Sequence, residues 1–356
     1  MKISLFKGTL EIVLNNFQSF LDKKDQSQIT SHIFLQASEN TLLLRATDYE
    51  LGIQSKIEVN ILEEGIGTVN GKQFLDIVKQ LKDNEEITLQ TDENYCLHIK
   101  QKGTAYKLQM YNAEEFPKFP QYSQDKKIDI SASQFIDSIK KITPAVSTNN
   151  PKIELNGAFL DIKEYSINLV ATDTKRLALV KNETQSIHTL SIIIPKRALG
   201  EITKLFSDHL EIFYNENQLI IQTGNYTFFT KLTNGKFPDY ERIIPNNFNF
   251  NFELNRADVI DSLKAIYSIS DKVKSVFNKG EILFEGLEIE KGEAKTKINA
   301  EIDPSEEVIL NFNARNLLDF LSQIQSQTFT LHINDVKSAF MVKSESFSTI
   351  IMPVVV

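Results

Sequence analysis

Three segments of the chain repeat the same order of hydrophobic and polar positions. Each begins with an amphipathic helical period, continues with three apolar runs broken by polar turns, and ends at a proline. The three segments are Asn70–Pro117, Pro195–Pro238 and Asn313–Pro353. The apolar stripes of their helices open at Phe74, Ala198 and Leu317, which are 124 and 119 residues apart. A repeat of this length predicts a whole domain rather than the unit of a solenoid.

A second helical pattern precedes each segment. The three patterns are Gly8–Lys24, Ser131–Ile142 and Asn255–Ser270. In the second pattern, Phe135, Ile136 and Ile139 recur at the spacing of one helical face. Ser133 and Asn255 are the predicted N-caps of the second and third helices. Each repeat is therefore expected to contain two helices.

Short apolar runs follow each of these first helices and predict β-strands. They include His32–Ala37, Thr41–Ala46, Gly157–Ile162, Ser166–Ala171 and Glu281–Glu285. Asn and Asp residues stand between later runs at equivalent places in all three copies, as expected of hairpin turns. We predict an α+β fold of three similar domains, each with two helices and antiparallel sheets. The predicted domains are 1–120, 127–244 and 250–356.

Composition excludes several classes of protein. The chain has 356 residues, of which 41% are hydrophobic and 24% charged, as in ordinary globular proteins. Cys96 is the only cysteine, so no intramolecular disulfide can form. The N-terminus lacks a signal-peptide pattern, and no run approaches the roughly 20 apolar residues that cross a bilayer. We therefore expect a cytoplasmic protein without membrane association.

Patterns for catalysis are absent from the sequence. The five histidines show no metal-ligand spacing, and there is no Gly-x-Ser-x-Gly nucleophile motif. The run Gly65–Lys72 departs from a phosphate-binding loop, because Gln73 stands where Ser or Thr is needed. We expect no metal, no cofactor and no enzymatic activity.

Lysine and arginine gather in the helical segments, although the formal net charge of the chain is −8. Solvated helix faces would explain this distribution. Helices that present cations to a DNA phosphate backbone would explain it as well. Under the second interpretation, the candidate DNA-facing residues are Lys23, Lys24, Lys140, Lys141, Asn149, Asn150, Lys152, Lys196 and Arg197.

Four motifs in order along the chain carry a family resemblance. They are Ala46–Ile53 (ATDYELGI), Leu155–Gly157 together with Ala171–Ala178 (ATDTKRLA), Phe237–Pro245 (FPDYERIIP) and Met352–Val356 (MPVVV). Each resembles a signature of the bacterial DNA polymerase III beta subunits, the sliding clamps. Any one motif is weak evidence, but four in the right order across three repeats are strong evidence.

The resemblance implies a DNA-clamp fold, in which a head-to-tail homodimer makes a six-domain ring lined by twelve helices. Helices about 10 Å apart would give an axis radius of ~19 Å, and a hole wide enough for a duplex of ~10 Å radius. It implies a non-catalytic processivity factor that encircles double-stranded DNA of any sequence. Its partners would be the DNA polymerase III alpha subunit, the clamp loader and other proteins with a clamp-binding motif. An enzyme of repeated domains and a scaffold ring without DNA are the alternatives.

The resemblance also places two protein contacts. The implied peptide-binding pocket contains Leu155, Thr172, Thr174, Lys175, Arg176, Leu177, Pro238, Arg242, Ile243, Ile350, Met352, Pro353 and Val354. The implied dimer interface contains Tyr106, Leu108, Ile266 and Ile269. The chain has Thr174-Lys175 where the family usually has Gly-His, and a valine-rich end where the family has a longer apolar residue, a basic residue and Leu. We expect these differences to change the preferred polar positions of the bound peptide.

Overall fold

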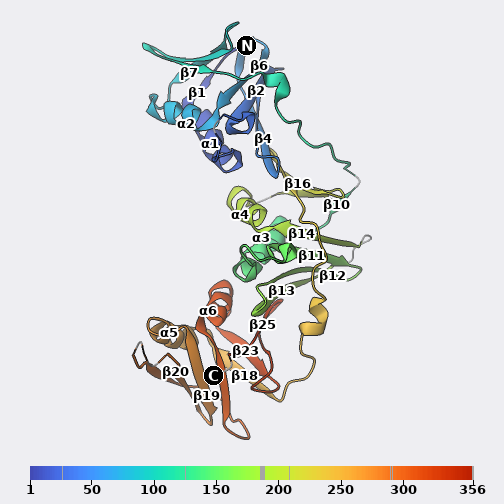
Figure 1. Ribbon diagram of the computed structural model, residues 1–356, viewed down its shortest axis with the longest axis vertical. Coiled ribbons are helices and arrows are strands. Elements are labelled where there is room, and N and C mark those ends of the chain that lie inside the picture. Colours follow the sequence, from blue (N-terminus) through green and yellow to red (C-terminus); the bar gives the residue numbers. More distant parts are fainter. Residues whose placement is uncertain are drawn as a thin grey trace. The chain divides into compact units, whose positions relative to one another are not determined.

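The computed structural model describes residues 1–25, 27–124, 126–184, 189–207, 209–288, 290 and 292–354 (Figure 1). The chain forms two compact units. Unit 1 consists of Met1–Ala132 and Gly200–Leu232, and unit 2 of Ser133–Leu199 and Thr233–Val356. Every strand pair within the described residues is antiparallel, and the predicted α+β class is confirmed. None of the helices described is long and apolar enough to cross a membrane.

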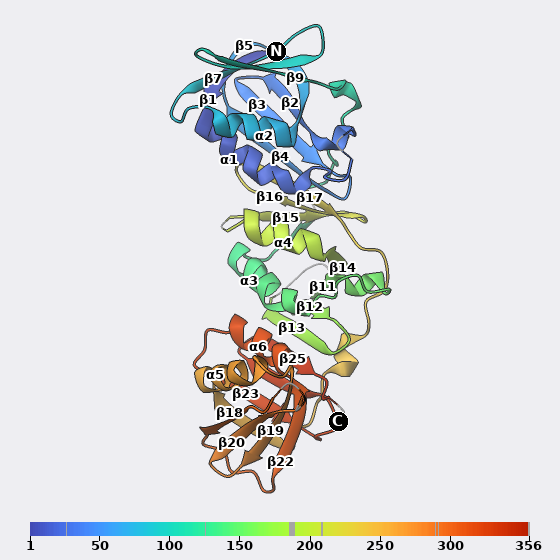
Figure 2. The same ribbon diagram turned by 60° about the vertical axis from the view of Figure 1, so that its left-hand side comes forward.

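Unit 1 contains two antiparallel sheets. Five strands are ordered β5-β1-β7-β8-β9, and eight are ordered β10-β15-β16-β17-β4-β3-β2-β6. The strands are β1 (Lys2–Phe6), β2 (His32–Ser38), β3 (Thr41–Thr47), β4 (Leu51–Glu58), β5 (Asn60–Glu63), β6 (Gly65–Asn70), β7 (Glu86–Thr91), β8 (Cys96–Gln101), β9 (Thr104–Gln109), β10 (Lys127–Ile128), β15 (Glu211–Tyr214), β16 (Gln218–Gln222) and β17 (Tyr226–Lys231). Helices α1 (Lys7–Phe17) and α2 (Gly71–Gln80) lie side by side and bury apolar faces that include Leu14 and Phe74 (Figure 2).

Unit 2 repeats this plan. Its eight-stranded sheet is ordered β14-β11-β12-β13-β25-β24-β23-β18, and its four-stranded sheet β21-β20-β19-β22. The strands are β11 (Gly157–Lys163), β12 (Ser166–Thr172), β13 (Arg176–Glu183), β14 (Leu190–Pro195), β18 (Phe250–Asn255), β19 (Lys272–Asn278), β20 (Glu281–Gly286), β21 (Lys295–Asn299), β22 (Val308–Asn313), β23 (Thr328–Ile333), β24 (Phe340–Ser344) and β25 (Phe347–Ile351). Helices α5 (Arg256–Tyr267) and α6 (Ala314–Gln323) pack together (Figure 2).

The remaining helices belong to the middle repeat or are single 3₁₀ turns. The two α-helices are α3 (Ala132–Ile142) and α4 (Lys196–Leu205). The 3₁₀ turns are η1 (Gln18–Phe20), η2 (Ile29–Ser31), η3 (Ala113–Glu115), η4 (Thr143–Ala145), η5 (Ile153–Leu155) and η6 (Tyr240–Ile243).

Each eight-stranded sheet joins strands from two copies of the repeat. In unit 1, β17 pairs with β4, so that Thr230 lies opposite Leu51. In unit 2, β25 pairs with β13, so that Ile351 lies opposite Arg176. β17 and β25 are the last strands of the second and third repeats, and β4 and β13 are the equivalent strands of the first and second. The two junctions therefore have the same construction.

The middle repeat gives strands to both units. Strands β10 and β15–β17 belong to unit 1, whereas β11–β14 belong to unit 2. This division follows from the sheet pairing, because each half-sheet of the middle repeat continues into a terminal repeat. The limits 1–120, 127–244 and 250–356 describe the repeat in sequence, and as domain limits they remain a prediction.

Two predicted helix C-termini are wrong. The pattern Gly8–Lys24 gives a helix only to Phe17, followed by η1. Lys23 and Lys24 lie beyond it, where the Asp22 carboxylate accepts the Lys24 N–H at 2.8 Å and turns the chain. Helix α5 ends at Tyr267, so Ile269 lies outside it.

The two predicted N-caps have different outcomes. Asn255 caps α5, because its side-chain oxygen accepts the N–H groups of Ala257 and Asp258. Ser133 lies inside α3, which begins at Ala132, so it is not the N-cap of that helix.

Candidate functional site

A four-residue turn between β12 and β13 organises the candidate site in unit 2. The Thr172 hydroxyl donates to the Arg176 carbonyl at 2.6 Å. One Asp173 carboxylate oxygen accepts the N–H groups of Lys175 and Arg176, both at 3.0 Å. Thr174 has a φ of +74°, which the tight turn requires. As a result, Thr174 and Lys175 are exposed, while Arg176 is buried.

Arg176 ties the turn to two other elements of unit 2. Its Nε lies 3.1 Å from the Asp173 carboxylate, and its Nη1 lies 2.7 Å from that of Asp319 on α6. Its Nη2 donates to the Pro144 carbonyl in η4. Two carboxylates thus balance a guanidinium that is only 7% exposed, as a buried charge requires. Arg176 lines the pocket, but its charge is already paired within unit 2, and its contact with a peptide remains a prediction.

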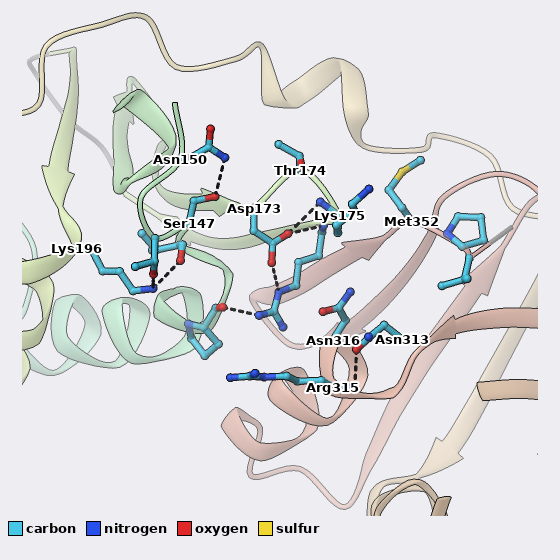
Figure 3. A pocket seen from close by; sticks show the side chains of 16 residues that line it. Ser147, Asn150, Asp173, Thr174, Lys175, Lys196, Asn313, Arg315, Asn316 and Met352 are labelled. Atoms are coloured by element: carbon cyan, nitrogen blue, oxygen red, sulfur yellow. Dashed lines mark hydrogen bonds and ion pairs between the residues drawn. The ribbon is translucent and has the colours of Figure 1, made fainter. Parts of the chain in front are cut away.

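Beside this turn lies a pocket of about 910 Å³ (Figure 3). It is lined by Pro144, Val146, Ser147, Thr148, Asn150, Asp173, Thr174, Lys175, Arg176, Lys196, Asn313, Arg315, Asn316, Met352, Pro353 and Val354. Met352, Pro353 and Val354 form one side of it. The Met352 N–H donates to the Lys175 carbonyl at 2.9 Å, and the Val354 N–H to the Asn311 carbonyl at 2.8 Å. Val355 and Val356 lie outside the described residues.

Lys196, at the start of α4, reaches into the pocket (Figure 3). Its Nζ donates to the Val146 carbonyl at 2.8 Å and to the Thr148 hydroxyl at 2.6 Å. Burial lowers the pKa of Lys196, and the nearby Arg176 charge lowers it further. The ammonium thus lies in an environment that would favour an incoming negative charge.

An apolar cluster lies next to the pocket. It comprises Leu155, Val170, Leu177, Leu179, Ile193, Phe237, Tyr240, Met341 and Ile350. Leu155, Leu177 and Ile350 were predicted to line a peptide site, and each is at most 2% exposed. Leu177 and Ile350 lie opposite each other in the β13–β25 pair. In this state of the protein these three residues are core, so a peptide could reach them only if the covering side chains moved.

The structure brings only some of the predicted pocket residues together. Thr174, Lys175, Arg176, Met352, Pro353 and Val354 meet at the pocket. Thr172 is buried beneath the turn. Pro238 is half-buried, whereas Arg242 and Ile243 in η6 are exposed, and none of these three is among the described lining residues. Arg242 makes an exposed ion pair with Asp239 at 2.9 Å.

Eight lining residues were absent from every predicted site. They are Pro144, Val146, Ser147, Thr148, Asp173, Asn313, Arg315 and Asn316. Asn313 begins the third repeat segment and caps α6, where its side chain accepts the Arg315 N–H at 3.0 Å. That capping pattern was visible in the sequence, but its proximity to the β12–β13 turn depends on the pairing of β13 with β25.

The candidate DNA-facing residues have different surroundings. Lys23, Lys24, Lys140, Asn149, Lys152 and Arg197 are exposed. Lys141 is largely covered and pairs with Asp137 at 2.7 Å. Asn150 and Lys196 are half-buried and line the pocket, so part of their hydrogen bonding is used within the protein. Contact with DNA remains a prediction for the whole set.

Of the four residues predicted for the dimer interface, three remain suitable. Tyr106 and Leu108 are half-buried on β9, and Ile269 is half-buried just after α5. The assignment of Ile266 is wrong, because it is 0% exposed inside its own subunit. A side chain that is already covered cannot bury further area against a second copy.

Among the described residues, no group of three or more His, Cys, Asp or Glu side chains is placed to hold a metal ion. The sequence matches three family models in order. They describe the N-terminal, central and C-terminal domains of the DNA polymerase III beta subunit and match residues 1–120, 129–239 and 241–355.

Curated relatives match over nearly the full length. The beta sliding clamp of Helicobacter pylori is 37% identical, over 99% of this chain and 100% of the relative. The beta sliding clamp of Staphylococcus aureus is 26% identical, over 96% of each chain.

Solved structures agree with these matches. The H. pylori beta clamp bound to a DNA ligase peptide has a TM-score of 0.94 and 37% identity, and the match covers all of both chains. The DNA polymerase III subunit beta of Pseudomonas aeruginosa has a TM-score of 0.94 at 22% identity, again over all of both chains, which supports the fold alone. The chain therefore belongs to the DNA polymerase III beta subunit family, the bacterial beta sliding clamps, which are processivity factors rather than enzymes.

Proposed function

We propose that this sliding clamp acts as a head-to-tail dimer that encircles duplex DNA and tethers client proteins at the unit 2 pocket. The clients would include the replicative polymerase, the clamp loader and proteins such as DNA ligase. The H. pylori relative with a bound DNA ligase peptide supports the client role. We place the protein in the cytoplasm, where bacterial DNA replication takes place.

One observation carries the proposed ring. Each junction within the chain pairs the last strand of one repeat with the strand of the preceding repeat that occupies the position of β4. The two pairs are β17 with β4 and β25 with β13. Among the described strands, one strand at each of these two positions lies at a sheet edge. One belongs to the first repeat and the other to the third. They are β9 in unit 1 and β21 in unit 2. Edge strands expose unpaired backbone groups that a second chain can complete.

Two copies can satisfy both edges reciprocally. If β9 of one copy pairs with β21 of the other, the junction between subunits has the same construction as the two junctions within the chain. Two such junctions close a ring of six repeats, which is the condition for a finite head-to-tail assembly. On β9, Tyr106 and Leu108 are half-buried while their neighbours are exposed. Thr296 and Ile298 alternate in the same way on β21. Each edge thus has an apolar face that a partner would cover.

The charge distribution supports a DNA-lined interior. The six α-helices described carry eleven Lys or Arg and seven Asp or Glu side chains. The whole chain carries 39 and 47. The helices are therefore net positive in a net negative protein. A loosely held phosphate backbone without base contacts would keep the ring on DNA of any sequence and allow it to slide.

Topological trapping tests the proposal. Labelled protein is loaded by a bacterial clamp loader and ATP onto nicked circular DNA, and the complex is isolated by gel filtration. Cutting the circle once should release the protein, because a ring slides off a free end. Native mass spectrometry should give twice the 40.6 kDa subunit mass. Retention that is equal on circular and linear DNA would contradict encirclement and favour a scaffold.

A further inference from the structure

Each unit contains a link between two repeats that packs on its eight-stranded sheet. We call residues 116–122 the unit 1 link and residues 237–248 the unit 2 link. The first residue of each link is a phenylalanine. Its ring packs against a phenylalanine at the equivalent position of β2 or β11, at centroid distances of 5.5 and 4.8 Å. The two links therefore start from the same contact, and the residues that follow it can be compared directly.

Three residues after this contact the two links use different chemistry. Unit 1 has Phe119, whose ring lies edge-on to that of Phe229 at 4.9 Å. Unit 2 has Tyr240, whose hydroxyl donates to the Asp161 carboxylate at 2.8 Å and accepts from the Asn168 amide at 3.1 Å. Burial raises the pKa of Tyr240, and the bond to Asp161 raises it further, so the hydroxyl remains a donor.

The polar contacts of Tyr240 belong to a buried network. Its three side chains are each at most 7% exposed. The Ser191 hydroxyl donates to the other Asp161 oxygen at 2.9 Å, and the Lys163 ammonium lies 3.6 Å from the oxygen that Tyr240 binds. Lys163 also pairs with Glu241, the next residue of the link, at 2.5 Å. Because a buried polar group is costly when its bonds are lost, the network favours one position of the link.

Unit 1 has uncharged residues at the same places in its sheet. The first hairpin of each sheet turns through two residues, so positions along β2 and β3 correspond to positions along β11 and β12. Gln36 takes the place of Asp161. Leu43 takes the place of Asn168. Apolar packing is often at least as stable as a buried charged network. Stability alone therefore does not explain why the network occurs in unit 2, where the pocket lies.

The ring of Tyr240 connects the network to the pocket. It belongs to the apolar cluster beside the pocket, together with Leu177 and Ile350. Leu177 directly follows Arg176, and Ile350 lies two residues before Met352. Arg176 and Met352 both line the pocket. A displacement of Tyr240 would therefore reach the pocket through one layer of closely packed side chains.

We infer that Tyr240 is a positioning residue for client docking. Its hydroxyl fixes the unit 2 link against Asp161 and Asn168. The fixed link keeps Leu177 and Ile350, and with them the pocket walls, in the arrangement that a client binds. A site that is arranged in advance binds more tightly, because less order has to be imposed on binding. The inference rests on the proposed function, since it assumes that clients dock at the unit 2 pocket.

Removal of the hydroxyl tests the inference. Tyr240→Phe keeps the ring and loses both polar contacts. The probe is a fluorescent DNA ligase peptide, the kind of ligand bound to the H. pylori beta clamp. Anisotropy should show its affinity reduced about fivefold, which is the order of effect of one hydrogen bond. Native mass and retention on circular DNA should be unchanged.

The unit 1 link provides the matched control. The Tyr122 hydroxyl donates to the Gln222 side chain at 2.9 Å. Tyr122→Phe therefore makes the same chemical change in a link that has no contact with the apolar cluster beside the pocket. Peptide affinity should stay at the wild-type value. An equal loss of affinity in both variants would show that the effect is not specific to Tyr240 and would overturn the inference.

A variant that copies unit 1 separates positioning from stability. Asp161→Gln, Asn168→Leu and Tyr240→Phe together place the three unit 1 side chains in unit 2. We expect a urea unfolding midpoint close to that of the wild type, because apolar packing replaces the network. Peptide affinity should nevertheless remain at least about fivefold lower. Full affinity in this triple variant would overturn the inference, because the network would then serve stability alone.

Mobility of the link gives a second readout that does not depend on the triple variant folding. Arg242 lies in η6 on the unit 2 link, and its side chain is 86% exposed. Cys96 is buried, so a nitroxide attached to Arg242→Cys labels the link selectively. Its spectrum should show greater mobility when Tyr240→Phe is added and no change when Tyr122→Phe is added. An unchanged spectrum with Tyr240→Phe would contradict the inference.

The remaining outcomes separate the inference from the proposed function. If the wild type binds the peptide and Tyr240→Phe binds it equally well, the inference is wrong and the docking site stands. If the wild type does not bind the peptide, or if deletion of Met352–Val356 leaves its affinity unchanged, the proposed docking site is wrong and the inference fails with it.

Discussion

The same turn occurs at the two junctions within the chain, and it has different surroundings in each. In unit 1 the Thr47 hydroxyl donates to the Leu51 carbonyl at 2.7 Å, and in unit 2 the Thr172 hydroxyl donates to the Arg176 carbonyl at 2.6 Å. Tyr49 and Thr174 have nearly equal φ angles of +72° and +74°. The two junctions therefore share a backbone motif but differ in the side chains around it.

The residue after the turn decides what lies beside it. In unit 1 Gly52 stands opposite Phe229, and a Cβ on Gly52 would lie 2.1 Å from the Phe229 ring. Phe119 packs edge-on against that ring at 4.9 Å. In unit 2 the equivalent pair is Leu177 and Ile350. An aromatic ring fills the first junction, whereas smaller side chains close the core of the second and leave the turn beside a pocket.

Charge differs at the same positions. In unit 1 Lys231 donates its N–H to the Glu50 carbonyl, and their side chains form an ion pair at 3.2 Å. In unit 2 Met352 makes the equivalent backbone bond to Lys175, and the lysine charge remains for a ligand. Under the proposed function, one repeat provides a structural joint in one place and a docking site in another.

Breaking the proposed junction between subunits should have the largest effect. Leu108→Asp on β9 combined with Ile269→Asp just after α5 would bury two charges at the proposed junction, where they have no partner. We expect folded monomers and loss of retention on circular DNA. Sedimentation velocity and circular dichroism would show mass and folding. A double variant that remains dimeric would remove these residues from the interface.

Deleting Met352–Val356 removes one side of the pocket without touching the first junction. The deletion removes two backbone hydrogen bonds, from the Met352 N–H to the Lys175 carbonyl and from the Val354 N–H to the Asn311 carbonyl. Affinity for client peptides should fall by a factor of about 100 or more, because a hydrophobic anchor and a pocket wall are lost together. Calorimetry would measure it. Dimer mass and trapping on DNA should be unchanged.

Substitutions at Gly52 and Phe229 test how the first junction is packed. Gly52→Ala should lower the free energy of unfolding by about 1–3 kcal/mol, because the new methyl group overlaps the Phe229 ring. Gly8→Ala on α1 is the matched control, since nothing lies within 4 Å of its Cβ position. Gly52→Leu with Phe229→Ile copies the second junction and should recover part of the loss. Urea unfolding midpoints would report all three.

Acid should weaken unit 1 through a buried histidine that unit 2 lacks at the equivalent positions. His32 is buried, and burial lowers its pKa to about 4. At the equivalent strand starts, unit 2 has Gly157 and Lys272. Below pH ~6.5 the unfolded state binds a proton that the folded state does not, so stability present above that pH is lost as the pH falls toward 4.

The expected loss between pH 7 and pH 5 is about 1–2 kcal/mol. His32→Phe should flatten this dependence while it keeps a ring beside Tyr111, whose ring lies 4.3 Å from that of His32. His209→Gln, at an exposed histidine, should not change the profile. An unaltered slope in the His32 variant would contradict the assignment.

Local patterns in the sequence were sufficient to predict the elements. The stripe of Phe135, Ile136 and Ile139 and the cap at Asn255 specify helices through near neighbours, and both are found in the structure. The end of α1 at Phe17 was missed because apolar residues continue at Phe20 and Leu21, although the backbone there forms the 3₁₀ turn η1. Pairing between repeats, such as β25 with β13, depends on contacts about 170 residues apart and has no local signal.

The site was predictable only in part for the same reason. The family motif identified the turn and the tail, and Thr174, Lys175, Met352 and Pro353 do meet. It did not reveal that Arg176 is neutralised by Asp319, or that Lys196 lines the pocket, because both depend on tertiary packing. Ile266 was misplaced since an apolar residue on a helix can face its own core or a partner, and the period alone does not distinguish them.

Photo-cross-linking from the two turns tests most directly that clients dock at the second junction. Cys96 is the only native cysteine and is buried, so a new cysteine can be labelled selectively. Tyr49→Cys and Thr174→Cys place a photoreactive group on equivalent, exposed turn positions. A client peptide should cross-link from position 174 and give only background from position 49. Equal yields from the two positions, or a higher yield from position 49, would contradict the account.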